Sequence, residues 1–77
     1  MTKAEFIKVV KDHMRNNKNQ WLNQRFIVDG KNVGIKLFNK SIQAMEIDGV
    51  RYGGVWEIPT QKQVVEIISN RIEGRGN

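Results

Sequence analysis

Hydrophobic and polar residues follow two different periods along the chain, and the period changes near Trp21. Before this point apolar residues recur every three or four positions, as in a helix laid against a core. From Trp21 to Ile58 apolar and polar residues alternate in short runs, which is typical of strands with one buried face. The helical period returns after Pro59. The pattern therefore predicts a helix at each end of the chain and strands between them.

The first helix is predicted to run from Thr2 to about Lys18. Thr2 and Glu5 have the spacing of a capping box, in which each side chain accepts a hydrogen bond from a backbone N–H group of the first turn. Asparagines in the segment 16–19 weaken helical propensity and indicate the end of the helix. The predicted apolar arc consists of Phe6, Ile7, Val10, His13 and Met14.

Pairs of turn-forming residues divide the middle of the chain into four strands. Asp29-Gly30 is a strong hairpin signal, because glycine accepts the positive φ of a tight turn. Asn39-Lys40 and Asp48-Gly49 mark the next two turns, and the fourth strand is predicted from Val50 to about Ile58. Short turns between consecutive strands favour an antiparallel meander.

The last helix is predicted to begin at Thr60, which repeats the capping-box spacing with Gln63. Gly74 suits the position just after a helix, and we expect residues 74–77 to be a frayed tail. The whole chain is thus interpreted as one α+β domain, residues 1–77, of order α-β-β-β-β-α. Both helices are predicted to pack on one face of the four-stranded antiparallel β-meander.

Two-residue turns fix the register of the strands, and the register sorts the side chains onto two faces. Gly53-Gly54 could form a bulge, which would move Trp56 to the core face and Val55 outside. Without that bulge, the predicted core face holds Leu22, Phe26, Val28, Val33, Ile35, Leu37, Ile42, Ala44 and Val55. The predicted outer face then holds Trp21, Arg25, Ile27, Lys36, Phe38, Gln43, Met45, Ile47, Tyr52 and Trp56.

Composition limits the classes of function. The 77 residues contain no cysteine, which excludes disulfides, a thiolate nucleophile and cysteine-based zinc sites. No apolar run approaches the length of a membrane span or of a signal peptide, so we expect a cytoplasmic protein without membrane contact. The net charge of +5 favours acidic partners, such as nucleic acid or a nucleoprotein, although a merely solubilising charge is the alternative.

Candidate catalytic and metal-binding residues are few. His13 is the only histidine, and the sequence places no serine or acid as its partner. Glu46 and Asp48 point to one face at a strand end, which is commonly acidic and exposed. The remaining acids match no metal-ligand spacing. The sequence therefore predicts no enzyme, no catalytic residue, no metal or other cofactor, and no small-molecule substrate.

Two candidate binding surfaces remain. The first is a basic stripe on the first helix, whose cations could each meet a phosphate: Lys8, Lys11, Arg15 and Lys18. The second is the outer sheet face, where cations lie among rings on which unpaired bases could stack: Trp21, Arg25, Lys36, Phe38 and Tyr52.

The main hypothesis is a small non-enzymatic protein that binds nucleic acid or a nucleoprotein complex. The alternative is a protein-interaction module or inhibitor that acts through its aromatic sheet face. Such an inhibitor would suit the accessory proteins of phages and mobile elements, including anti-CRISPR proteins that occlude a nucleic-acid channel. The apolar outer face would also suit a homodimer.

Overall fold

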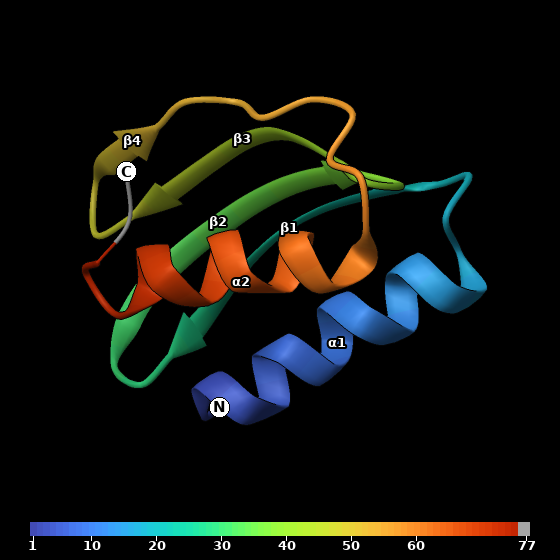
Figure 1. The fold of residues 1–77 in the computed structure, drawn as a ribbon. Helices are drawn as coiled ribbons and strands as arrows, with labels where there is room; N and C mark the ends of the chain where they lie inside the picture. The colour runs from blue at the N-terminus through green and yellow to red at the C-terminus, as the bar shows by residue number, and fades with distance from the viewer. Residues whose placement is uncertain (76–77) are drawn as a thin grey trace.

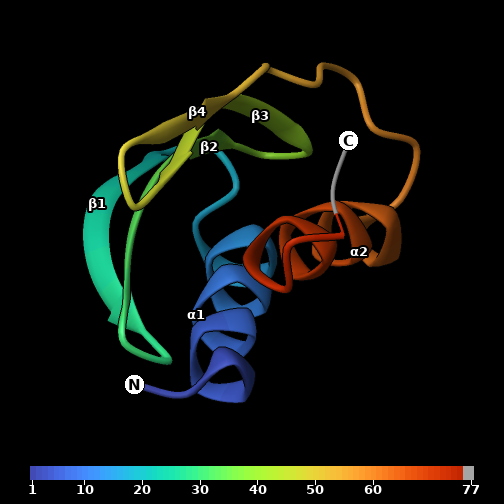
Figure 2. The same ribbon diagram turned by 90° about the vertical axis from the view of Figure 1, so that its left-hand side faces the viewer.

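The computed structural model describes residues 1–75 and has the predicted order of elements. The strands form one antiparallel sheet in the order β1-β2-β3-β4. The two helices lie side by side against one face of this sheet, which curves around them (Figures 1 and 2). The elements are α1 (Lys3–Asn16), β1 (Trp21–Val28), β2 (Lys31–Phe38), β3 (Ser41–Ile47), β4 (Val50–Tyr52) and α2 (Gln61–Ile72). The predicted α+β fold is confirmed.

Both helices begin at the predicted caps. The Thr2 hydroxyl accepts a hydrogen bond from the Glu5 N–H group, and the Glu5 carboxylate accepts one from the Thr2 N–H group, so the capping box is complete. The Thr60 hydroxyl likewise accepts a hydrogen bond from the Gln63 N–H group. The prediction for the end of α1 was wrong by two residues, because Asn17 already leaves the helical conformation and Lys18 lies in the following turn.

The last turn of α2 is closed by Gly74, which follows the helix as predicted and has a positive φ of 78°. The Gly74 N–H group donates to the Arg71 carbonyl and the Arg75 N–H group donates to the Asn70 carbonyl, at 3.1 and 2.8 Å. These two hydrogen bonds join Gly74 and Arg75 to the end of α2, and the fraying of residues 74–77 stays a prediction. Residues 76–77 of that predicted tail lie outside the described part of the chain.

The fourth strand is much shorter than predicted. β4 ends at Tyr52, and the chain touches β3 again only where Val55 and Ile42 form an isolated bridge. Val55 is half-buried against the core, whereas Trp56 is 57% exposed. Of the two predicted arrangements at Gly53-Gly54, the structure therefore has the one that leaves Trp56 on the surface.

The bulge that determines which side chains face the core lies in β3 instead of at Gly53-Gly54. Leu37 pairs with Ile42, but the preceding residue Lys36 pairs with Ala44, so Gln43 is an extra residue in β3. Between this bulge and Tyr52 the strand residues have the opposite face from the one predicted, whereas Val55 and Trp56 keep their predicted faces. Ala44 is exposed, contrary to its predicted core position, and the predicted outer residues Met45 and Ile47 are buried.

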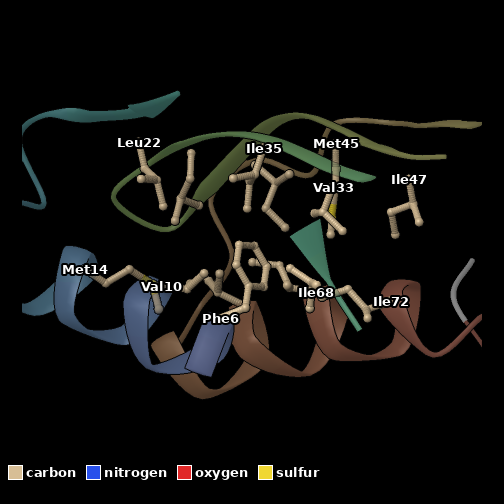
Figure 3. Close-up of a cluster of buried hydrophobic side chains, with 14 of the residues drawn as sticks. Phe6, Val10, Met14, Leu22, Val33, Ile35, Met45, Ile47, Ile68 and Ile72 are labelled. Atoms are coloured by element: carbon tan, nitrogen blue, oxygen red, sulfur yellow. The ribbon is translucent and has the colours of Figure 1, made fainter. Parts of the chain in front are cut away.

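The core fills the space between the sheet and the two helices (Figure 3). Phe6 of α1 packs its ring against Phe26 of β1, with centroids 5.0 Å apart and planes at 62°. Burial of each large apolar side chain contributes roughly 1.5–3 kcal/mol. The buried apolar residues are Phe6, Val10, Met14, Leu22, Val28, Val33, Ile35, Leu37, Ile42, Met45, Ile47, Ile58, Val64, Ile68 and Ile72.

Candidate binding surfaces

The two helices are antiparallel neighbours, and this arrangement adds a cation to the predicted basic stripe. The Gln61 side chain, in the first turn of α2, donates to the carbonyl of Met14 near the end of α1. A groove between the helices at this end is lined by Lys11, Arg15 and Lys62, together with Gln61, Val65 and Glu66. We define the basic helix surface as Lys8, Lys11, Arg15, Lys18 and Lys62.

The cations of the basic helix surface have no carboxylate partner. In the described part of the chain, no acidic oxygen lies within 4.0 Å of any of them. At the opposite end of the helices, by contrast, Lys3 and Arg75 both pair with Glu73, and these contacts hold the pKa of the Glu73 carboxyl at about 2. The unpaired positive charge of the helical layer therefore concentrates where α1 ends and α2 begins.

Sequence reasoning missed Lys62, which the fold brings beside a helix far away in the chain. A local signal was present, because acidic residues normally favour the first turn of a helix and the first turn of α2 contains none. A cation at this place opposes the helix dipole. Lys18 is not part of α1. It lies only two residues beyond Asn16, however, and so remains at this end of the molecule.

The outer face of the sheet carries an aromatic cluster at the start of β1. Trp21 lies directly opposite Phe38 of β2, and their ring centroids are 5.0 Å apart. The Lys36 ammonium lies 5.3 Å from the centroid of the Trp21 ring, within reach of a cation–π interaction. Trp21 is 48% exposed. We define the aromatic cluster as Trp21, Lys36 and Phe38.

The other cations of this face are largely neutralised. The Arg25 guanidinium donates to one oxygen of Glu46 at 2.8 Å, and Arg51 lies 3.8 Å from the other oxygen. The Arg25 side chain lies over Gly34, where an added Cβ would come within 3.3 Å of Nη1. These residues line an open depression beside Lys36. Because two guanidinium groups share one carboxylate, this face offers less free charge to a phosphate than the basic helix surface does.

Tyr52 does not belong to the outer face, and the prediction that placed it there was wrong. It pairs with Met45, so the bulge in β3 turns both side chains toward α2. The Arg71 guanidinium lies 5.2 Å from the centroid of the Tyr52 ring and donates to the Gly53 carbonyl at 2.9 Å. Arg71 is almost fully buried, and this burial lowers the pKa of its guanidinium. Tyr52 therefore packs α2 against the sheet edge.

His13 has a structural contact. Its side chain is buried, and Nε2 lies 2.8 Å from the carbonyl oxygen of Gln20, so the ring ties the end of α1 to the turn before β1. Within residues 1–75, no three histidine, aspartate or glutamate side chains cluster closely enough to hold a metal ion. Over the same residues, neither helix combines the length and the apolarity of a bilayer span.

The two surfaces belong to different layers of the molecule. The helices cover only one face of the sheet (Figure 2). The register places the aromatic cluster on the other face, because Trp21 and Phe38 alternate with the buried Leu22 and Leu37. Comparison of the chain with protein-family models, curated proteins and solved structures gives no match.

Proposed function

We propose that this protein binds nucleic acid through the phosphate backbone, using the basic helix surface. The observation that supports the proposal is the groove that brings Lys11 and Arg15 of α1 together with Lys62 of α2. None of the five cations of the basic helix surface has a carboxylate within 4.0 Å in residues 1–75. Unpaired cations cost little to bring to a phosphate, because no existing ion pair has to break. Each phosphate they neutralise releases counterions, which favours binding at low salt.

The spacing along α1 suits a nucleic-acid strand. Lys8 and Arg15 are seven residues apart and therefore about 10 Å apart along the helix axis. This length corresponds to about three phosphates of one strand of a duplex. Lys62 then widens the contact across the groove between the helices. Backbone contact of this kind predicts binding with little dependence on base sequence.

The proposal is tested by the salt dependence of binding. Fluorescence anisotropy with a labelled duplex and a labelled single strand measures the association constant over a series of salt concentrations. We expect Lys11→Glu to lower the affinity for all sequences alike and to reduce the slope of log K against log salt by about 1. The double variant with Arg15→Glu should reduce that slope by about 2.

Arg51→Glu provides the matched control, because it makes the same change in net charge on the opposite side of the sheet. Its side chain is 91% exposed, so solvent screens the like charge that the variant sets opposite Glu46, and a thermal melt checks that the variant is folded. The proposal is wrong if the wild type shows no salt-sensitive binding once copurifying nucleic acid is removed. It is also wrong if Arg51→Glu weakens binding as much as Lys11→Glu does.

A protein-interaction module or inhibitor is the second candidate. It is favoured by the exposed apolar side chains of the outer sheet face, where Trp21 is 48% and Ile27 59% exposed while Arg25 and Arg51 share Glu46. Affinity purification with and without nuclease separates the two candidates. A partner that survives nuclease treatment and is lost with Trp21→Glu would support this second candidate. A partner that is lost with nuclease and with Lys11→Glu would support the first.

A further inference from the structure

β1 is an edge strand, and its alternate backbone groups point away from the sheet. The turn at residues 29–30 closes on the pair Val28 and Lys31. In an antiparallel ladder, the even-numbered residues of β1 then exchange hydrogen bonds with β2, and the odd-numbered residues direct N–H and C=O outward. Met1 confirms this orientation: its amino group donates to the Ile27 carbonyl, and the Asp29 N–H group donates to the Met1 carbonyl, each at 2.9 Å.

The rest of this edge is unoccupied within the described residues. Beyond the place that Met1 takes, the outward groups of Trp21, Asn23 and Arg25 have no backbone partner among residues 1–75. Gln24, which points to the helical side, is exposed, so α1 does not seal this stretch. β1 contains no proline, lysine or bulge, and its one charged side chain, Arg25, is paired with Glu46.

The opposite edge of the sheet is protected in several ways. β4 has only three residues, and the chain leaves the sheet directly after it. Arg71 donates to the Gly53 carbonyl at that edge. Short edge strands and covered carbonyls are devices that prevent strand pairing. The contrast identifies β1 as the edge that is open to a further strand.

We propose that β1 pairs antiparallel with β1 of a second copy of this chain, about a twofold axis that passes through Asn23. In this register Trp21 pairs with Arg25 of the partner subunit, Asn23 pairs with its own copy, and each pair exchanges two hydrogen bonds. This register gives hydrogen-bond partners to the outward N–H and C=O groups of Trp21, Asn23 and Arg25 together. The interface is independent of the proposed nucleic-acid binding.

Other registers satisfy fewer of these groups. An axis through Arg25 would need the outward groups of Ile27, where Met1 already binds, and it would set Arg25 directly against its own copy. An axis through Trp21 would leave Asn23 and Arg25 unpaired. The axis through Asn23 instead places a guanidinium beside the exposed Trp21 ring, where cross-strand packing and cation–π attraction are favourable.

The first test removes one outward hydrogen-bond donor. In sedimentation equilibrium, the wild type should have twice the monomer mass of 8.9 kDa. Asn23→Pro deletes an N–H group that does not bond to β2, and proline is tolerated at such edge positions. We expect this variant to weaken association at least about tenfold, whereas Asn23→Ala, which keeps the N–H group, should behave like the wild type. A monomeric wild type at its highest soluble concentration would overturn the proposal.

The second test uses the symmetry and does not depend on proline. Asn23→Lys and Asn23→Asp each set like charges against one another across the axis, so each variant alone should associate at least about tenfold more weakly than the wild type. An equimolar mixture should recover dimers, because the two variants then pair lysine with aspartate. If both variants associate as the wild type does, or if the mixture remains monomeric, the proposed register is wrong.

Discussion

Gly54 lies where the chain that leaves β4 passes closest to β3. The Ile42 N–H group donates to the Val55 carbonyl at 2.7 Å, and the Val55 N–H group donates back at 2.8 Å. A Cβ added at position 54 would lie 2.9 Å from the Gln43 carbonyl oxygen and 3.0 Å from that of Ile42. Both atoms are backbone atoms held by the bulge and the bridge. Gly54→Ala must therefore displace the segment from β3.

The expected cost follows from this overlap. Forcing an extra methyl group into a packed site costs about 1–3 kcal/mol. Alanine regains about 0.4–1 kcal/mol by restricting the unfolded chain. From the middle of the two ranges the net loss is about 1.3 kcal/mol, which should lower the Tm of a chain of this size by roughly 5–10 °C. Thermal unfolding followed by circular dichroism measures this shift.

Gly53→Ala is the matched control, because a Cβ at position 53 meets nothing within 4 Å. The control should leave the Tm unchanged or raise it slightly, since only the unfolded-state effect remains. Equal Tm values for the two variants would refute the reasoning, because they would show that the contact with β3 relaxes without cost.

Two further predictions concern the helix ends. Thr2→Ala should lower the free energy of unfolding by about 1 kcal/mol through loss of the capping box, and Thr2→Ser should restore it; equal urea midpoints for Thr2→Ala and the wild type would contradict this. Lys3 and Arg75 hold the pKa of Glu73 at about 2, below its ordinary 4.5. The unfolded chain therefore binds more protons over this range, and stability should fall as the pH drops from 4.5 toward 2. Glu73→Gln should flatten that decline in acid titrations of unfolding, and an unchanged slope would count against the assignment.

Local chemistry explains why the elements could be predicted. The cap residues Thr2 and Thr60 act within one helical turn, and they begin the helices where the sequence indicates. The predicted hairpin turns have positive φ at Asp29, Asn39 and Asp48, as tight turns require. Each of these signals depends only on residues close in the chain, so a single sequence is enough to locate it.

The bulge in β3 was missed because it depends on contacts between distant residues. No glycine or proline marks Gln43 as an extra residue. A different signal was available: strict alternation from Ile42 would have placed Glu46 in the core and Met45 outside. Burial of Met45 and Ile47 favours the bulged register, because each contributes roughly 1.5–3 kcal/mol and the Glu46 carboxylate stays on the outer face, where it pairs with Arg25. Lys62 was missed for a similar reason, since only the packing of α2 on α1 brings it to Lys11.

The bulge also changes which self-association the fold favours. The predicted homodimer through the outer sheet face depended on a large apolar patch that included Met45, Ile47 and Tyr52. These three side chains point instead toward the helices, which leaves a smaller patch of the aromatic cluster and Ile27. A patch of that size provides less apolar area for a face-to-face dimer. Backbone pairing along β1 needs no such area, because its hydrogen bonds come from groups that the sheet already aligns, and it leaves the aromatic cluster free for another partner.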